Sequence, residues 1–345
     1  MILVTGATGL LGSHLLLGLL HRGYRVRALH RAESNVERVR QIFSYYEPDP
    51  DQWLEQVEWR AASLTDQWAM EEALDGVTTV YHVAAKVSFH AADHKEMLRV
   101  NIGGTAMLAD LSIAAGVSQF CHVSSIATLG RVSGQEKCTE ETYWVPSKQN
   151  SVYSISKYGA EREIWRGMQE GLRAVIINPS VILGPGFWQE NSALFRLSYK
   201  GMPFYTDGMN GYVDVRDVAS AMIMLTEGGH FGERFICSAA NLTYYELFSM
   251  MAKQFGKKPP VIRVPAQLAG YAWRAEAVRA FLKSTRPAIT REIAATAIRG
   301  YSYSSEKLIR ATGFQFREPD ETIREICQFF LRDHNDNPKN RAIST

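Results

Sequence analysis

A glycine-rich turn directly follows the first apolar run of the chain, and few folds can use such a turn. Residues 2–5 are followed by Gly6-Ala7-Thr8-Gly9-Leu10-Leu11-Gly12, and apolar residues then recur near a period of 3.6 as far as His21. Glycines let the backbone turn tightly and approach phosphate oxygens, while the start of a helix presents free amides and the positive end of its dipole. We therefore expect a strand, a turn that holds the pyrophosphate of a dinucleotide, and a helix.

Short β-branched or apolar runs alternate with longer helical patterns through the first half of the chain. The runs cover residues 2–5, 25–29, 57–60, 79–83, 120–123 and 174–178. Helical spacing extends over 10–21 and 97–115, and the stretch 36–54 indicates a helix, a surface turn around Pro48 and the start of a second helix. This alternation is typical of βαβ units, and it predicts an α/β fold with a doubly wound parallel sheet, the Rossmann fold.

Glycine and proline punctuation becomes denser after Pro179, which predicts a second lobe. We expect residues 1–179 to form the dinucleotide-binding domain, with 211–226 returning to it. Residues 180–335 should form a smaller C-terminal α/β lobe that binds the substrate, and 336–345 a flexible tail. The polar connection 131–150, between a strand end and the next helix, is of the length that often borders a site.

The composition excludes several classes of function. The formal net charge of +2 gives no support for a nucleic-acid or anionic-membrane surface. The four cysteines are far apart in sequence, as expected for a reducing compartment, and nothing before the glycine turn predicts an export leader. The apolar stretches are short or interrupted, and 265–282 contains charges, so that segment predicts a packed amphipathic helix. We therefore expect a cytoplasmic protein.

The choice of cofactor depends on the residue that ends the second strand. An acidic side chain there, about twenty residues past the turn, would bond a ribose 2′-hydroxyl. This chain has His30-Arg31 instead, without a carboxylate at that strand end to repel a phosphate. A guanidinium can pair with a 2′-phosphate, so the sequence favours NADP, with NAD as the alternative if Arg31 is only a surface charge.

Tyr153 and Lys157 are four residues apart at the start of a predicted helix, which places the phenol and the ammonium on one face. A tyrosine has an ordinary pKa near 10, and a neighbouring cation lowers that pKa so that the phenol can act as an acid or a base. Ser124 and Ser125 follow a strand, at the edge where open α/β sheets bind ligands. A hydroxyl at that edge can bond a substrate carbonyl.

At this point the chain resembles the extended short-chain dehydrogenase/reductase family, which includes sugar-nucleotide epimerases and dehydratases, dihydroflavonol-type reductases and 3β-hydroxysteroid dehydrogenases. The resemblance runs from Met1 to about Phe330. Its ordered markers are Thr5-Gly6-Ala7-Thr8-Gly9-Leu10-Leu11-Gly12, His82-Val83-Ala84-Ala85, Asn101-Ile102-Gly103-Gly104-Thr105, Val123-Ser124-Ser125, Tyr153 with Lys157, Asn178-Pro179-Ser180 and residues 212–219.

The resemblance assigns roles to individual residues. Tyr153 would donate or accept the proton, Lys157 would lower its pKa and hold the nicotinamide ribose, and Ser125, selected over Ser124 by its distance from Gly130, would orient the carbonyl. Asn101 is a candidate for a structural or water-relay role. Residues implied to contact the cofactor are Gly6, Thr8, Gly9, Leu10, Leu11, Gly12, Arg31, Ser63, Leu64, Ala84, Ala85, Lys157, Pro179 and Ser180. Ser63 stands where many relatives bond adenine through an aspartate.

The substrate is less constrained. His82, His90 and His122 lack a ligand-like spacing, so we expect core or edge histidines and no metal. If aromatic side chains such as Trp188 and Phe195 line the cleft, the small-molecule substrate has a bulky apolar part. Ile126-Ala127 stand where a dehydratase would carry acids, so dehydration is disfavoured.

Three hypotheses follow. The first is a reductase that interconverts a secondary alcohol and a ketone or aldehyde. The second is an NAD-dependent nucleotide-sugar epimerase, which could use the basic residues Arg196, Lys200 and Arg216. The third is a non-catalytic dinucleotide sensor, and a retained acid disfavours it. By analogy with relatives, helices over 97–115 and 153–170 could form a homodimer.

Overall fold

The computed structural model describes residues 1–88, 90–130, 137–147, 150–188, 192–265, 268 and 300–336. The chain divides into two compact units. The first contains Met1–Ser180, Arg216–Ser238 and Tyr303–Gln315, and the second contains Val181–Val215, Ala239–Ser302 and Phe316–Thr345. The helix expected over 265–282 lies outside the described residues apart from Pro265 and Leu268, and the expected tail lies outside them apart from Asp336.

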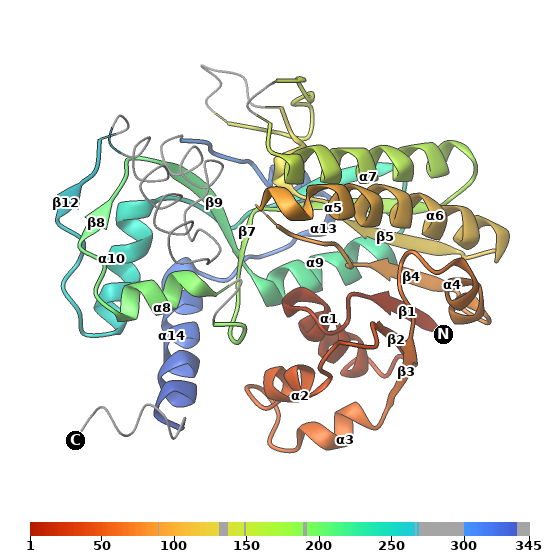
Figure 1. Ribbon diagram of the computed structural model, residues 1–345, viewed down its shortest axis with the longest axis horizontal. Helices are drawn as coiled ribbons and strands as arrows, with labels where there is room; N and C mark the ends of the chain where they lie inside the picture. Colours follow the sequence, from red (N-terminus) through yellow and green to blue (C-terminus); the bar gives the residue numbers. More distant parts are fainter. Residues whose placement is uncertain are drawn as a thin grey trace. The chain divides into compact units, whose positions relative to one another are not determined.

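The first unit is built on a parallel sheet. In the described part of the chain the sheet has seven strands, in the order β10-β6-β5-β4-β1-β2-β3, and every adjacent pair is parallel. The strands are β1 (Ile2–Thr5), β2 (Val26–His30), β3 (Val57–Ala61), β4 (Thr79–His82), β5 (Gln119–Val123), β6 (Ala174–Pro179) and β10 (Glu233–Cys237). The predicted Rossmann fold is confirmed (Figure 1).

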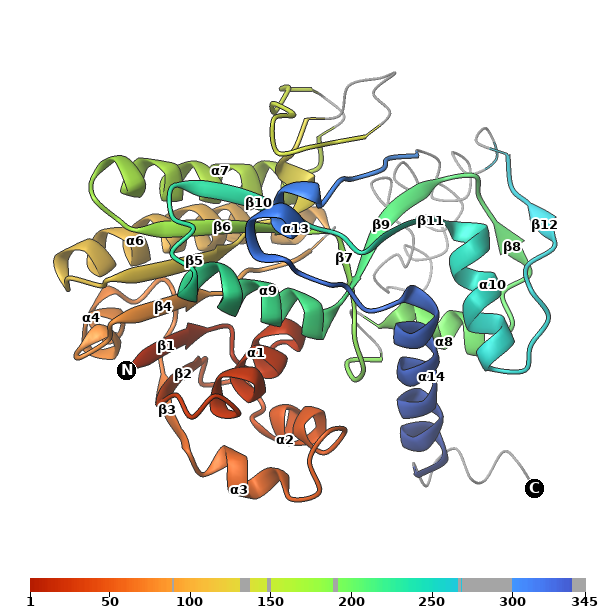
Figure 2. The ribbon, with the colours of Figure 1, turned by 180° about the vertical axis from the view of Figure 1, so that it is seen from behind.

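Helices cover both faces of this sheet. They are α1 (Leu10–Leu20), α2 (Glu37–Phe43), α3 (Pro50–Leu54), α4 (Gln67–Leu74), η1 (Ala91–Asp93), α5 (His94–Leu98), η2 (Arg99–Gly103), α6 (Gly104–Ala114), η3 (Ile126–Thr128), α7 (Val152–Gln169), α9 (Val215–Glu227) and α13 (Glu306–Thr312). Figures 1 and 2 show α6 and α7 on one face and α1 and α9 on the other. The first face packs Met70, Leu108 and Ile164 against sheet residues such as Leu3 and Ile176.

Two sequence expectations differ from the structure in detail. The pattern over 97–115 predicts one helix, but α5 and α6 are joined by the π-helical turn η2. The segment 211–226 was expected to return to the first domain as a whole. Its strand part belongs to β9 (Met209–Asp214), which pairs with β7 (Val181–Leu183) and β11 (Ala240–Thr243) in a separate sheet, and α9 and β10 make the return instead.

The second unit has its own core. Besides the β7–β9–β11 sheet it contains α8 (Ala193–Tyr199), β8 (Phe204–Tyr205), α10 (Tyr244–Gln254), β12 (Ile262–Arg263) and α14 (Pro319–Asp336). Apolar side chains from α8, α10 and α14, including Phe195, Leu247 and Phe330, form one buried cluster. Helix α10 begins with a capping box in which Thr243 and Glu246 bond each other's backbone amides.

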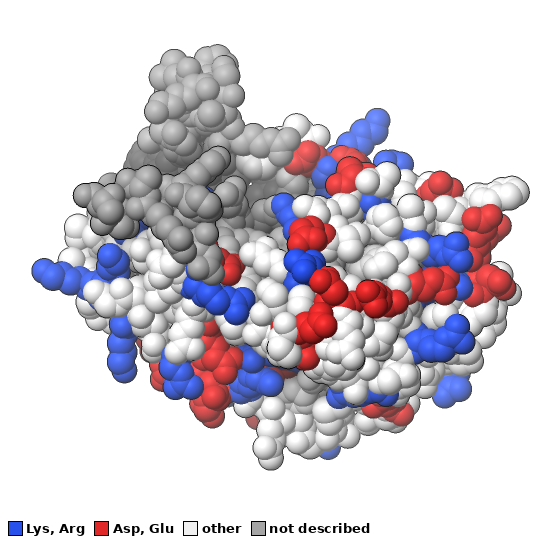
Figure 3. Space-filling view, turned by 90° about the horizontal axis from the view of Figure 1, so that it is seen from below, with Lys and Arg blue, Asp and Glu red and all other residues white. Residues whose placement is uncertain are grey.

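Charge is spread over the surface. Basic and acidic side chains are interspersed across the described part of the face in Figure 3, in line with the near-balanced formal charge. No helix among the described residues combines the length and the apolarity that a membrane span requires.

Candidate active site

The glycine turn between β1 and α1 is too crowded for side chains. Gly6 has φ +69°, and a Cβ added to it would lie 2.7 Å from the backbone nitrogen of Ala84. A Cβ on Gly12 would lie 2.1 Å from the carbonyl oxygen of Gly6. Only glycine fits either position without a shift of backbone.

The start of α1 fits an anionic ligand. The helix begins after Gly9 without a side-chain cap and without an acidic residue in its first turn. Its first amides therefore have no capping side chain, and the positive end of the helix dipole lies beside the bare turn. The residues present fit the pyrophosphate of a dinucleotide.

Arg31 follows β2 and is exposed. Its guanidinium lies 3.3 Å from the carboxylate of Glu33, and its backbone amide donates to Ser34 Oγ at 3.2 Å. The sequence suggests that a repelling carboxylate is missing at this strand end, and the structure corrects that point. Glu33 lies in the loop two residues further on and already pairs with Arg31, so a 2′-phosphate would have to displace it.

The next candidate residues lie where β3 and β4 end. The side-chain oxygens of Ser63 and Thr65 are 3.1 Å apart, and Leu64 packs against the core beneath the sheet. The backbone amide of Ala84 donates to Thr5 Oγ1 at 3.1 Å, which ties the loop after β4 to the end of β1. Ala84 is half-buried and Ala85 is exposed.

Asn101, in the turn η2, is buried and links the loop after β4 to the helix α7. Its Oδ1 accepts from the backbone amide of Lys86 at 2.7 Å, and its Nδ2 donates to Ser156 Oγ at 3.0 Å. Asn101 therefore ties the chain after β4 to α7. π-helical turns often occur at functional sites.

Tyr153, Lys157 and Ser125 lie where β5 ends and α7 begins. Ser151 caps α7 by accepting from the amide of Ser154. Tyr153 is half-buried and forms a hydrogen bond with Ser125, whose Oγ also accepts from the amide of Ala127 at 3.1 Å. The structure thus brings together the phenol and the hydroxyl that the sequence predicts as partners.

Burial acts on the pKa values of both helix residues. Lys157 is 4% exposed, and its Nζ donates to the carbonyl oxygen of Val123 at 2.7 Å. Burial lowers the pKa of Lys157 to about 8, against an opposing effect of Glu161. The sequence predicts a lowered pKa for Tyr153. Burial instead raises the pKa of this phenol, and the hydrogen bond from Ser125 is the opposing effect.

The histidines beside the site are core residues. His82 is buried between Thr5 and Thr105, whose hydroxyl oxygens lie 2.8 and 2.9 Å from its ring nitrogens. Burial and the charge of Lys157 lower the pKa of His82 to about 3, so the ring is neutral at pH 7. Among the described residues, no cluster of histidine, cysteine and acidic side chains has a metal-binding arrangement.

Pro179 and Ser180 end β6, next to β10. The amide of Ser180 donates to the carbonyl of Cys237 at 3.0 Å, while its buried Oγ has no hydrogen-bond partner. A buried hydroxyl without a partner is costly, so it is available to a polar ligand group. This arrangement suits the nicotinamide carboxamide that the sequence places beside it.

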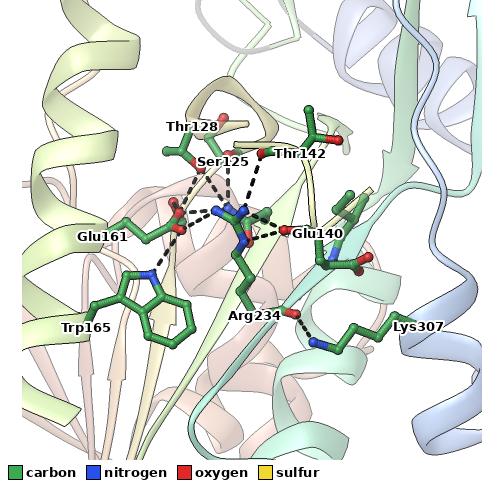
Figure 4. Close-up of polar contacts among 11 residues, drawn as sticks. Ser125, Thr128, Glu140, Thr142, Glu161, Trp165, Arg234 and Lys307 are labelled. Carbon is green, nitrogen blue, oxygen red and sulfur yellow. Dashed lines mark hydrogen bonds and ion pairs between the residues drawn. The ribbon is translucent and has the colours of Figure 1, made fainter. Parts of the chain in front are cut away.

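A buried carboxylate, Glu161, was missed by the sequence reasoning. It accepts hydrogen bonds from Ser124 and Thr128 on the chain around Ser125, from Asn178 on β6 and from Arg234 on β10 (Figure 4). Glu161 is the next residue in the series that begins with Tyr153 and Lys157 at a spacing of four. That spacing, which puts an acid on the same face of the helix, is the signal that could have found it.

The aromatic residues expected to rim a cleft have other roles in the second unit. Phe195 is 1% exposed, and Trp188 lies 5.1 Å from the ring of Phe330 and donates to Asp333 at 2.9 Å. Both side chains therefore pack in the core of that unit. In the first unit, Trp144 stacks on Tyr158 with ring centroids 4.5 Å apart.

A parallel sheet with a bare glycine turn at the carboxyl ends of its strands defines a dinucleotide-binding α/β protein. Residues 2–237 match the model of the NAD dependent epimerase/dehydratase family. The chain belongs to this family, and it is an enzyme of the extended short-chain dehydrogenase/reductase class, as its ordered markers predict.

Individual relatives agree with this assignment. A putative dihydroflavonol 4-reductase of Synechocystis sp. is 28% identical over 95% of this chain and 93% of its own length. Sterol demethylase protein B of Methylococcus capsulatus is 29% identical over 77% of this chain and 78% of its own length. The crystal structure of gox2253 is 29% identical, superimposes with a TM-score of 0.80, and covers 96% of this chain and 98% of that one.

The glycine turn yields a first prediction. Gly12→Ala should lower the melting temperature and weaken the affinity for NADP⁺ at least about tenfold, because the added Cβ would collide with the carbonyl of Gly6. Gly18→Ala on the same helix is the matched control, since its Cβ would meet Ile223 at an ordinary 3.5 Å. Thermal unfolding and a fluorescence titration with NADP⁺ measure both effects, and equal behaviour of the two variants would contradict this reading.

Burial of Lys157 yields a second prediction. Between about pH 8 and 10.5 the folded chain loses this proton before the unfolded chain does, so the residue's contribution to stability increases as the pH rises. Urea unfolding from pH 7 to 10 should show wild type gaining free energy of unfolding relative to Lys157→Met. A difference that stays constant with pH would refute the depressed pKa, and Lys95→Met, at an exposed lysine, is the control.

Proposed function

We propose that this enzyme is an NADP-dependent oxidoreductase that interconverts a secondary alcohol and a ketone or aldehyde. The observation that carries the proposal is the hydrogen bond between Ser125 and Tyr153, beside the buried ammonium of Lys157. A phenol that is bonded to a serine hydroxyl and close to a buried cation can exchange a proton with an alkoxide. Pure dinucleotide binding would need none of these groups.

The roles of the residues follow from their chemistry. When bound, the nicotinamide supplies or accepts the hydride. Ser125 donates a hydrogen bond to the substrate carbonyl, and Tyr153 delivers the proton to the same oxygen. The ammonium of Lys157, one helical turn away, would favour the phenolate that this leaves behind, and the hydrogen bond from Ser125 opposes the effect of burial on the pKa of Tyr153.

The cofactor is held by the glycine turn and by the strand ends that follow it. The pyrophosphate lies against the turn residues Gly6, Thr8, Gly9, Leu10, Leu11 and Gly12. The adenine side is bordered by Ser63 and Leu64, and the cofactor groove is lined by Ala84 and Ala85. The nicotinamide ribose and ring are bordered by Lys157, Pro179 and Ser180. Arg31 selects NADP by pairing with the 2′-phosphate in place of Glu33.

The substrate is a small molecule with a bulky apolar part. The similarity to a putative dihydroflavonol 4-reductase along nearly the whole chain supports a reductase with an aromatic or polycyclic ketone. We also propose a cytoplasmic location, on the basis of four buried free cysteines, and a homodimer through α6 and α7, by analogy with relatives.

The alternative is a nucleotide-sugar epimerase with retained NAD, which the name of the family favours.

One experiment distinguishes the two functions. The purified enzyme is incubated with NADPH and, in separate reactions, with each member of a panel that contains a dihydroflavonol, aromatic ketones and UDP-glucose. A reductase consumes NADPH with a ketone and releases NADP⁺. An epimerase instead carries bound NAD and changes the sugar without net change in cofactor.

Tyr153→Phe should reduce hydride transfer by at least about a hundredfold while leaving Kd for NADP⁺ largely unchanged, because the ring remains but the acid is lost. Tyr158→Phe on the same helix is the control, since Tyr158 stacks on Trp144 and has no assigned role in proton transfer. Initial rates of NADPH oxidation measure the effect. Undiminished turnover in Tyr153→Phe would exclude the mechanism.

Arg31→Asp should weaken binding of NADP⁺ at least about tenfold more than binding of NAD⁺, because a carboxylate repels the 2′-phosphate that the guanidinium pairs with. Glu33→Gln is the opposing variant. It removes the carboxylate that competes for Arg31 and should tighten NADP⁺ binding only. Calorimetric titration with both dinucleotides decides the matter, and equal losses for the two would refute the proposed specificity.

A further inference from the structure

Glu161 joins the helix that carries Tyr153 to the chain segment that carries Ser125. Glu161 is 1% exposed. One carboxylate oxygen, Oε2, accepts from Ser124 Oγ at 2.5 Å, from Thr128 Oγ1 at 2.8 Å and from Asn178 Nδ2 at 2.9 Å. Ser124 directly follows β5, Thr128 lies in η3 and Asn178 lies in β6, so one oxygen atom joins three segments of the chain to the helix α7.

The donors that bond Glu161 also hold the backbone of Ser125. Thr128 Oγ1 shares its single proton between Glu161 Oε2 and the carbonyl oxygen of Ser125, which lies 2.9 Å away. The same carbonyl oxygen accepts from Asn178 Nδ2 at 3.2 Å, and Ser124 is the neighbour of Ser125 in the chain. The backbone carbonyl of Ser125 is therefore held by Thr128 and Asn178, and both of these side chains also bond the carboxylate of Glu161. Its own Oγ accepts from the amide of Ala127, which leaves the hydroxyl proton to be donated.

The second carboxylate oxygen of Glu161 pairs with the positive charge of Arg234. Oε1 accepts from Arg234 Nη1 at 2.9 Å and from Trp165 Nε1 at 3.4 Å. Arg234 is held in turn through its Nε and Nη2, which donate to the carbonyl of Glu140 at 3.0 and 2.5 Å. All five of these side chains donate to Glu161, which suits a carboxylate. A glutamine would turn an NH₂ group toward at least one of these donors.

We propose that Glu161 is a positioning residue for hydride transfer: through Ser124, Thr128 and Asn178 it sets the Ser125 hydroxyl against Tyr153, which the same helix carries eight residues earlier. A helix is stiff over this length, so anchoring it at Glu161 fixes the relation between the phenol and the serine. The catalytic part of this inference rests on the proposed function, whereas the ordering of the Ser125 segment rests on geometry alone.

A purely structural role for the network predicts a different outcome. Removing a buried charge partner usually lowers global stability, and it would then affect the folded molecule as a whole. A positioning role instead affects one short segment and the chemical step. The test therefore compares local order, cofactor binding and turnover in the same full-length protein.

Hydrogen exchange of the peptide 119–130 tests the ordering directly. Within it, the amides of Ala127 and Thr128 donate to Ser125 Oγ and to the Ser125 carbonyl, both at 3.1 Å. In Glu161→Gln these amides should exchange at least about tenfold faster than in wild type, with the remaining peptides unchanged. Trp165→Phe is the matched control, because Trp165 donates to the same carboxylate but not to the Ser125 segment, and it should retain wild-type protection.

Turnover tests the catalytic part. With the ketone that oxidises NADPH fastest in the panel, Glu161→Gln should lower kcat at least about tenfold and leave Kd for NADP⁺ within about twofold of wild type. Thr128→Val removes one donor and keeps the shape of its side chain. Thr128→Val should likewise speed hydrogen exchange in the peptide 119–130 and lower kcat. If Glu161→Gln does not fold, the test uses Thr128→Val in its place.

The outcomes separate this inference from the proposed function. If none of the ketones in the panel supports oxidation of NADPH by wild type, the proposed reductase function is wrong. Hydrogen exchange then still decides whether Glu161 orders the Ser125 segment. Wild-type protection of 119–130 in folded Glu161→Gln, or in Thr128→Val if the glutamine variant does not fold, overturns the inference. If wild type does reduce a ketone, an unchanged kcat in the same variant overturns the catalytic part of the inference.

Discussion

The crowded backbone around Gly6 and Gly12 fixes where the active site can lie. The carbonyl of Gly6 occupies the space that a side chain at position 12 would need, and the space beside Gly6 is filled by the backbone of Ala84. This close packing sets the start of α1 against the ends of β1 and β4. Because all neighbouring strands are parallel, the same edge also carries the ends of β5 and β6. The glycine turn and the residues that we propose for proton transfer therefore share one edge of one sheet.

Charge in the interior of the first unit is arranged around α7. Burial lowers the pKa of Lys157, while its two histidine neighbours, His82 and His122, have pKa values lowered by their own burial and by the charge of Lys157. The histidines thus remain neutral and add no competing positive charge. Glu161 supplies the opposing negative charge and is itself paired with Arg234. A buried ammonium is kept in this way one helical turn from Tyr153.

Much of this arrangement could be predicted from local sequence. Strands with apolar runs, such as 2–5 and 174–178, were placed within a residue or so, because burial on both faces of a parallel sheet leaves a strong pattern. The division of 36–54 into two helices was also predicted, since Asp49 and Pro50 form a helix start that is visible in the sequence.

What could not be predicted depends on contacts between distant residues. Arg234 reaches Glu161 across 73 positions, and no periodicity reveals such a pair. The pairing of Arg31 with Glu33 depends on a loop conformation. The pKa of Tyr153 is dominated by burial, which a spacing of four residues does not encode. The placement of β9 in a separate sheet also depends on pairing partners that lie on either side of it in the chain.

Transfer of hydride from a reduced nicotinamide to a carbonyl carbon can be followed with an isotope. The measurement uses NADPH that carries deuterium at the transferable C4 position, together with a ketone from the panel, followed by mass spectrometry of the product. We expect an alcohol with one deuterium on its carbinol carbon and an equal amount of released NADP⁺. An alcohol without deuterium, or no alcohol from any ketone of the panel, would show that the site does not carry out this reaction.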